Sequence, residues 1–388
     1  MKNIITLVAG LMLVVSSATF AQKRDREERG ERSQTFTVEK GGRLEVNVRS
    51  GDITVTPSSK NEVTVNAEGI SSDDLDKLLM SQSGNTVRVE FRPRSRNWDW
   101  DDDNSHFDIS VPTDFNVDIK TSGGNLEING AINGRIEGST SGGDIILSDV
   151  IGTVDMSTSG GDIKVGNIKG NVKLRTSGGN IDLRKVDGET TVSTSGGDIR
   201  VESVGKRLDA STSGGDIDVG EVGGEARLST SGGDVTVGKV SGDARLSTSG
   251  GNVELRGASG TVVAKTSGGD IILENITGSI DAKTSGGDIR AELIPSGKGS
   301  SQLVSAGGDI KLYIPENAKA TIEAIIRVDS RWGRSRSRRD KYEVRSDFKS
   351  DTYDDREDDI RATYILNGGG ERITLETVNS NIEIRKKR

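Results

Sequence analysis

The chain has 388 residues, a formal net charge of −8, no cysteine and one histidine. Hydrophobic residues make up 31% of the chain and aromatic residues 3%, whereas an ordinary domain is about 45–50% apolar, so a large spherical core is not expected. The missing cysteines exclude disulfides and thiolate metal sites, and the single histidine argues against histidine catalysis and zinc binding. The mild acidity gives no support to nucleic-acid binding.

The N-terminus has the pattern of an export signal. Lys2 supplies a positive charge, residues 4–15 are apolar, and small residues lead to Ala21, after which we place the cleavage site. The apolar run of about 12 residues is shorter than the ~20 that span a bilayer. We therefore expect a signal peptide over 1–21, no transmembrane segment after its removal, and a location outside the cytoplasm, in the periplasm, on the cell surface or secreted. Residues 22–34 are highly charged and are predicted to be disordered.

Residues 35–118 are predicted to form an N-terminal β cap. Residues 50–53, Ser-Gly-Asp-Ile, are a single precursor of the motif that later repeats. Residues 72–80 suggest a short helix with Ser72 as its N-cap. Alternating apolar and polar residues predict strands at 36–38, 44–46, 53–55, 87–89 and 107–111.

The central part of the chain is an 18-residue repeat. Thr-Ser-Gly-Gly begins at ten threonines between 121 and 284, and eight of the nine spacings are 18 residues. One unit, residues 158–175, reads TSGGDIKVGNIKGNVKLR and contains the short alternating strands I-x-V and V-x-L. Period-two alternation directs Ile163, Val165, Val172 and Leu174 to one face, which we expect to be the inside, together with Thr158 and its equivalents as a hydroxyl ladder.

These units predict an all-β fold, a parallel β-solenoid over residues 119–312. It would have about eleven 18-residue coils, with equivalent strands ~4.8 Å apart and right-handed coiling. The β caps, 35–118 and 313–388, would cover the strand edges at its ends. The glycine pair is expected to adopt positive-φ turns and to avoid a clash with its copy in the next coil.

An Asp or Asn follows the glycine pair of every Thr-Ser-Gly-Gly repeat. Both residue types bond nearby backbone groups, which favours a structural role in the turn. The alternative is a ladder of cation sites, because calcium β-rolls also use 18-residue coils, although their G-G-x-G-x-D pattern is absent from both halves of this repeat. We expect no metal and no cofactor, and keep Asp198, Asp216 and Asp234 as secondary Ca²⁺ candidates.

Residues 313–388 are predicted to form a C-terminal β cap with a charged insertion over 331–359. Strands are expected around 320–328, 362–366, 373–375 and 382–384. Each cap has an insertion with candidate ligand contacts. In the N-terminal cap they are Trp98 and Trp100 beside an acidic run, and in the C-terminal cap they are Trp332 with Arg334 and Arg336, which suit an anionic polymer. For both insertions the favoured interpretation is a solvated loop.

Three segments resemble the putative-adhesin family of bacterial β-strand-repeat proteins. They are the opening strings GGRLEV and SGDITV, the repeated STSGGDI, and the closing NGGG followed by ITLETVNSNI. The resemblance covers about residues 35–388 and implies the fold. The family's domain is one of unknown function, so the resemblance implies no catalytic residue. The insertions at Trp98 and Trp332 depart from a minimal member.

The sequence leaves three functions open. The favoured one is an exported, non-enzymatic envelope protein with a structural or binding role, whose partner is an envelope or extracellular glycan or protein. A periplasmic component that senses envelope stress is the alternative. A polysaccharide-active β-helix enzyme is less favoured, because it needs clustered carboxylates and sugar-stacking aromatics, and residues 116–312 contain no aromatic residue.

Overall fold

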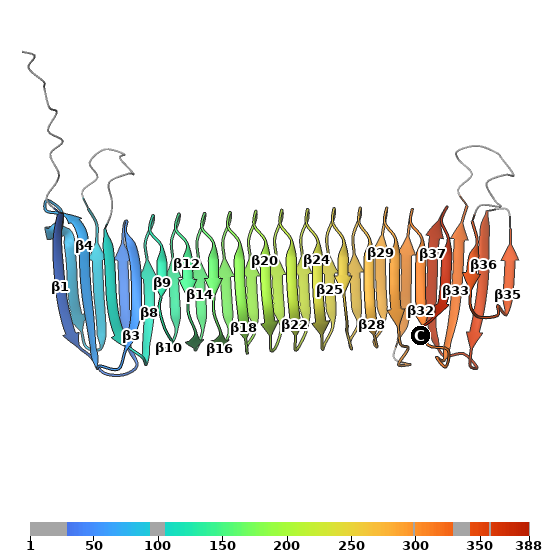
Figure 1. Ribbon diagram of the computed structural model, residues 1–388, viewed down its shortest axis with the longest axis horizontal. Coiled ribbons are helices and arrows are strands. Elements are labelled where there is room, and N and C mark those ends of the chain that lie inside the picture. Colours follow the sequence, from blue (N-terminus) through green and yellow to red (C-terminus); the bar gives the residue numbers. More distant parts are fainter. Residues whose placement is uncertain (1–28, 94–104, 298, 329–341, 357, 388) are drawn as a thin grey trace, which may run out of the picture.

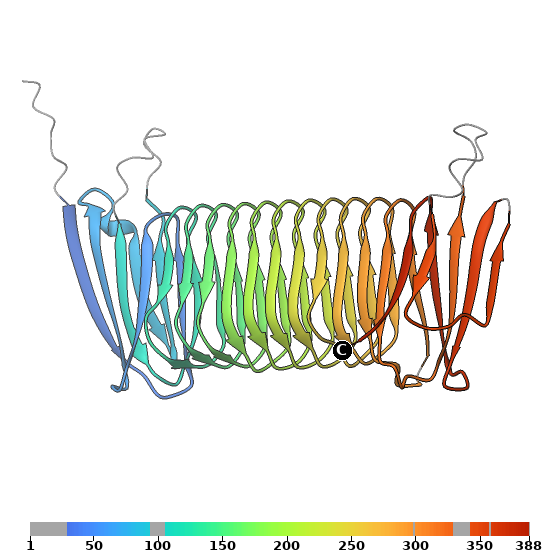
Figure 2. The same cartoon turned by 45° about the vertical axis from the view of Figure 1, so that its right-hand side comes forward.

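The computed structural model describes residues 29–93, 105–297, 299–328, 342–356 and 358–387. Within these ranges the protein is all-β, and its single helical element is the 3₁₀ turn η1 (Leu75–Lys77). Figures 1 and 2 show a long rod in which the chain runs back and forth between two sheets, from the blue N-terminal end to the orange and red C-terminal end. The first sheet, sheet A, contains the I-x-V strands, and the second, sheet B, contains the V-x-L strands.

The repeat strands of sheet A lie side by side in chain order and pair in parallel. Ile163, for example, is opposite Ile181, exactly one repeat later. The strands are β9 (Leu126–Ile128), β10 (Ile132–Asn133), β12 (Ile145–Leu147), β13 (Val150–Ile151), β15 (Ile163–Val165), β16 (Ile168–Lys169), β18 (Ile181–Val186), β20 (Ile199–Val204), β22 (Ile217–Val222), β24 (Val235–Val240), β26 (Val253–Leu255), β28 (Ile271–Ile276), β30 (Ile289–Leu293) and β32 (Ile310–Ile314).

Sheet B has the same parallel pairing with the same register, so that Val172 is opposite Thr190. Its repeat strands are β11 (Ile136–Ser139), β14 (Val154–Ser157), β17 (Val172–Arg175), β19 (Thr190–Ser193), β21 (Leu208–Ser211), β23 (Ala226–Ser229), β25 (Ala244–Ser247), β27 (Val262–Lys265), β29 (Ile280–Thr284) and β31 (Ser300–Ser305).

The core is a narrow apolar layer between the two sheets. Ile163, Val165, Val172 and Leu174 are at most 3% exposed, and Lys164 between them is exposed. This confirms the inward face that the alternation predicted. Because each repeat contributes only a few aliphatic side chains, the core is extended by adding repeats rather than by adding large residues.

The repeat glycines differ from the sequence-based expectation. No glycine of a described Thr-Ser-Gly-Gly repeat has a positive φ, so left-handed turn geometry is not the reason for the pair. The second glycine is needed for close approach, since a Cβ at Gly161 would lie 2.1 Å from the carbonyl oxygen of Gly143 in the preceding repeat. The first glycine, Gly160, has no neighbour closer than 3.5 Å to such a Cβ.

The N-terminal end adds antiparallel strands to both sheets. In sheet A, β4 pairs antiparallel with both β1 and β7, and in sheet B β5 pairs antiparallel with β6. The strands are β1 (Arg29–Thr37), β2 (Gly42–Val48), β3 (Asp52–Ser58), β4 (Glu62–Ser71), β5 (Leu78–Ser83), β6 (Thr86–Phe91), β7 (His106–Pro112) and β8 (Phe115–Lys120).

Two expectations for this end need correction. Residues 29–34 lie in β1 rather than in a disordered segment, because pairing with β4 gives their backbone groups partners despite the local charge. Residues 72–80 do not form the expected helix. They contain only the 3₁₀ turn and the start of β5, where Leu78 and Met80 are buried by pairing with β6.

At the C-terminal end the last two strands of the chain return to the repeat stack. β37 lies between β31 and β33, and β38 pairs with β32. The described part of the predicted insertion 331–359 contains two short strands, β34 and β35, which pair with β38 and β36. The strands of this end are β33 (Ala320–Arg327), β34 (Val344–Ser346), β35 (Thr352–Asp355), β36 (Asp359–Leu366), β37 (Glu371–Val378) and β38 (Ile382–Lys386).

Candidate functional site

The Asp and Asn residues after the glycine pairs form a ladder of hydrogen bonds between repeats. The Oδ1 atom of Asp198 accepts the backbone N–H of Asp216 at 3.0 Å, and Oδ1 of Asp216 accepts the N–H of Asp234 at 2.8 Å. The ladder starts before the repeats, at Asp52, and ends beyond them, at Asn381. The structural role that the sequence predicted therefore takes the form of bonds to the next repeat rather than to the residue's own turn.

The threonines of the repeat make a second ladder inside the first. Thr158 is buried, donates its hydroxyl to the carbonyl oxygen of Gly143 at 2.9 Å, and accepts the N–H of Gly161 at 3.3 Å. The predicted inward position of the threonines is confirmed, although their hydroxyls bond the backbone of the glycine pairs and not one another. The Thr-Gly-Asx motif thus satisfies the polar groups of the turn, which a tightly stacked rod cannot leave unpaired.

The hydrogen bonds of the ladder occupy part of the carboxylates that were considered as Ca²⁺ ligands. Asp198, Asp216 and Asp234 each use one carboxylate oxygen for the next N–H in the ladder. In the part of the chain that the structure describes, no three His, Asp or Glu side chains are grouped so that they could hold a metal ion. Whether the ladder responds to Ca²⁺ stays a prediction.

The candidate ligand contacts in the two insertions lie outside the described residues. These are Trp98, Trp100, Trp332, Arg334 and Arg336. The surface that the structure does describe is built instead from the outward-facing residues of the repeat strands, which vary from one repeat to the next while Thr, Gly and Asx recur.

The outer face of sheet A carries a groove, here called groove A, that crosses β12 to β22. It encloses about 910 Å³ and is lined at one end by Ala131 and Ile146, the latter 42% exposed. Its remaining lining includes three cations, Lys164, Arg184 and Arg200, and four carboxylates. Arg200 is bound to Asp198 of the ladder at 2.9 Å, and the charges of the two signs nearly cancel along this groove.

The outer face of sheet B carries a smaller groove, groove B, that crosses β19 to β27 and encloses about 420 Å³. Its charged lining residues are Asp209, Arg227, Arg245 and Lys265, and its hydroxyls come from Thr191, Ser211, Ser229 and Ser247. Three of its four charged side chains are cations, so groove B favours a negatively charged ligand, whereas the nearly balanced groove A does not.

Two of the three groove B cations, Arg227 and Arg245, contact an acid on the flank of the groove. Arg227 and Arg245 both contact Oε1 of Glu225, at 3.1 Å for Arg227, and Arg207 contacts its Oε2 at 3.7 Å. Arg207 holds Asp209 through two hydrogen bonds of 2.8 and 3.1 Å, and this contact raises the pKa of the Arg207 guanidinium above its ordinary value. The motifs in the sequence did not predict this group of residues. Aligning the repeats at their 18-residue period would have shown Arg227 and Arg245 at equivalent positions in two successive Ala-Arg-Leu-Ser strands.

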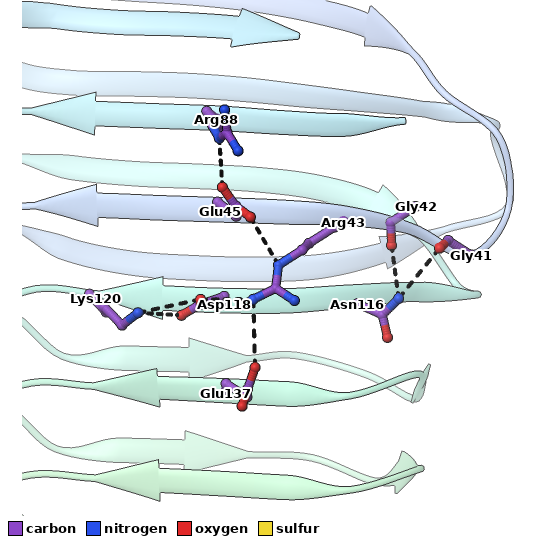
Figure 3. A network of polar contacts seen from close by, with 9 residues as sticks. All are labelled: Gly41, Gly42, Arg43, Glu45, Arg88, Asn116, Asp118, Lys120 and Glu137. Atoms are coloured by element: carbon purple, nitrogen blue, oxygen red, sulfur yellow. Dashed lines mark hydrogen bonds and ion pairs between the residues drawn. The ribbon is translucent and has the colours of Figure 1, made fainter. Parts of the chain in front are cut away.

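A third polar cluster joins the N-terminal end to the repeats (Figure 3). Arg43 on β2 contacts Glu45 at 3.1 Å, Asp118 on β8 at 3.0 Å, and Glu137 on β11 at 3.6 Å. Glu45 also contacts Arg88 on β6 at 2.6 Å. The cluster crosses four neighbouring strands of sheet B and its charges are paired among themselves, which indicates a clamp between the end and the first repeat.

The family of the chain is decided by its sequence. The family model described as Toastrack DUF4097 matches residues 42–223 and 202–327. These matches span more than half of the chain. This protein belongs to the Toastrack DUF4097 family. The resemblance to the putative-adhesin family is thereby confirmed. Separately, no helix among the described residues of this Toastrack protein is long and apolar enough to cross a bilayer.

Solved structures similar to this Toastrack chain have low sequence identity. One, described as a putative adhesin from Bacteroides fragilis, is 16% identical with a TM-score of 0.38, over 61% of this chain and 97% of its own. A putative adhesin from Parabacteroides merdae is 12% identical with a TM-score of 0.29, over 74% of this chain and 89% of its own. A protein from Parabacteroides distasonis described as a putative lipid binding protein is 11% identical with a TM-score of 0.22, over 92% of this chain and 97% of its own. No curated protein is significantly similar to the chain.

Proposed function

We propose that this Toastrack protein is an exported, non-enzymatic protein of the bacterial envelope that binds an extended ligand along its rod. In this proposal the rod is a parallel β-solenoid of about eleven 18-residue coils. Equivalent outward-facing side chains of successive coils are held ~4.8 Å apart along the rod. The ligand is a glycan or protein of the envelope or the extracellular space. The pattern of residues 1–21 supports export to the periplasm, the cell surface or beyond.

One observation carries the proposal. The recurrent Thr, Gly and Asx residues are engaged in bonds between repeats, whereas the varying outward-facing residues line two long grooves on opposite sheets. A scaffold that repeats its structural residues and varies its surface residues suits binding of an elongated partner, as in other solenoid proteins.

A glycan and peptidoglycan array tests the proposal. Mature protein, residues 22–388, is applied to the array, and the soluble phase is assayed for released reducing ends and unsaturated sugars. We expect retention on at least one polymer without release of product. Release that disappears on mutation of a specific carboxylate would show an enzyme instead. Cell fractionation with N-terminal sequencing of the isolated protein tests export and cleavage after Ala21.

A further inference from the structure

Groove B presents its cations and hydroxyls in two straight columns. Arg227 on β23 is directly opposite Arg245 on β25, and their side chains are 46% and 47% exposed. In the neighbouring column Ser211, Ser229 and Ser247 are in register on successive strands, and the next strand continues the column with the exposed Lys265. Both columns follow the rod axis with a step of ~4.8 Å.

The guanidinium groups retain unused hydrogen-bond capacity. The only carboxylate in contact with Arg227 and Arg245 among the described residues is Glu225, which Arg207 also contacts at 3.7 Å. Each guanidinium has five N–H donors in a fork that fits a carboxylate. The one carboxylate in the lining, Asp209, is held through both oxygens by Arg207 from the flank. The inner surface of the groove therefore has a surplus of positive charge, whereas groove A has slightly more carboxylates than cations.

The hydroxyls point to a ligand that is itself rich in hydroxyls. Serine donates and accepts hydrogen bonds, and Ser229 and Ser247 already lie 3.2 Å apart between their Oγ atoms. The lining contains no aromatic side chain, which does not fit the base stacking of single-stranded nucleic acid. The parallel ladder pairs the strand backbones with one another, so a peptide cannot add to the sheet across this face.

We propose that groove B binds a linear acidic glycan, a polymer of sugars with carboxylates, along the rod axis. Arg227 and Arg245 hold its carboxylates, the serine column holds its hydroxyls, and Lys265 adds a further cation. This inference rests on the proposed binding function and deepens it by naming the face and the ligand class.

Binding of mature protein to immobilised polygalacturonate, with neutral amylose as the comparison polymer, tests the inference. We expect binding to polygalacturonate that weakens with added salt, because exposed charges are screened, and no binding to amylose. The double variant Arg227→Gln with Arg245→Gln should lose at least about ten-fold in affinity. A matched double variant in groove A, Lys164→Gln with Arg200→Gln, should bind as the unchanged protein does.

A second variant keeps the test independent of damage to the fold. Glu225→Gln removes the negative charge that Arg227 and Arg245 share with Arg207. It is expected to tighten binding several-fold, an effect that partial unfolding would not produce. Melting curves of all variants accompany the binding data.

The outcomes separate the two proposals. Equal binding by the two double variants, equal binding of amylose, or binding only of an acidic peptide or nucleic acid would overturn the assignment of groove B. If another polymer binds elsewhere on the rod, the proposed function survives that failure. If neither this assay nor the array detects any ligand, both proposals fail.

Discussion

Both the middle of the rod and its two ends pair strands into the same two sheets, but the chain connects the paired strands differently in the two regions. In the middle, each strand pairs with its own equivalent 18 residues away, as Ile199 does with Ile217. At the ends the same ladders continue onto distant residues, so that Asn125 bonds Asp52 and Asn381 bonds Asp309, 73 and 72 residues apart. Antiparallel strands, such as β36 against β33, then follow in place of further repeats.

The repeats therefore set the length of the rod, and the two ends stop the strand stack from continuing. A stack of identical units has no reason to stop, and its last strands would expose unpaired backbone groups to other molecules. Removing a unit from the middle should therefore matter much less than removing an end.

The largest effect is expected from truncation. A chain that ends after Ile314 lacks β37 and β38, which cover β31 and β32, and we expect it to aggregate or to fail to fold. Deleting one repeat, residues 195–212, joins equivalent positions and should leave a monodisperse folded protein. Size-exclusion chromatography with circular dichroism compares the two. A soluble truncated chain beside an aggregated repeat deletion would reverse the assigned roles of middle and ends.

A smaller effect is expected from the glycine pair in the middle. Gly161→Ala places a Cβ 2.1 Å from the Gly143 carbonyl oxygen, and relieving that overlap should reduce the free energy of unfolding by about 1–3 kcal/mol. Gly160→Ala has room for the added carbon and should change it by less than about 0.5 kcal/mol. Denaturant unfolding measures both, and equal losses would show that contact with the preceding repeat is not what selects the second glycine.

The next smaller loss of stability is expected from changes in the Asp and Asn ladder. Asp216→Ala removes the acceptor of the Asp234 N–H and should cost about 0.5–2 kcal/mol, as loss of a capping side chain does. Asp216→Asn keeps that acceptor and should be nearly neutral.

Chelator distinguishes the structural ladder from a Ca²⁺ site. We expect the melting temperature to be unchanged by chelator in the wild type and in both Asp216 variants. A drop of many degrees in the wild type that Asp216→Asn partly abolishes would instead identify the column as a Ca²⁺ site.

The smallest effect concerns a contact at the C-terminal end. Asp347 accepts the N–H of Lys386 at 3.0 Å and a hydrogen bond from Arg385 at 3.0 Å, and these two contacts lower the pKa of its carboxyl. Because the pKa is lowered, the contact stabilises the folded protein at neutral pH, and this stabilisation is lost as the pH falls through the lowered pKa of Asp347. Protection of the Lys386 amide from hydrogen exchange should decrease in acid, after correction for intrinsic rates. Asp347→Asn should lack this pH dependence, and an identical profile in the variant would contradict the assignment.

The candidate site was only partly visible in the sequence. The period of 18 and the alternation within it place Lys164, Arg227 and Arg245 on the outside, because an inward residue must be apolar or fully hydrogen-bonded. The sharing of Glu225 by three arginines, and the hydrogen bonds from Arg207 to Asp209, depend on side-chain conformations across neighbouring strands. The tryptophans singled out because they lie beside acidic or basic runs are outside the described residues, so their role stays a prediction.

What the sequence by itself determined is the repeating part: the period, the two short strands of each unit, and the inward face of Ile163, Val165, Val172 and Leu174. These follow from local alternation, and stacking copies of one unit requires no information beyond that unit. The sequence also predicted strands in the two ends, but only the tertiary structure decided how those strands pair and which polar groups bond between repeats. A charged segment such as 29–34 becomes a strand because β4 is there to pair with it. Residues 371–386 rejoin the stack because their backbone and ladder groups find partners on β31, β32 and Asp309. Such pairings bring together segments that are far apart along the chain, and their stability comes from contacts that no local pattern specifies.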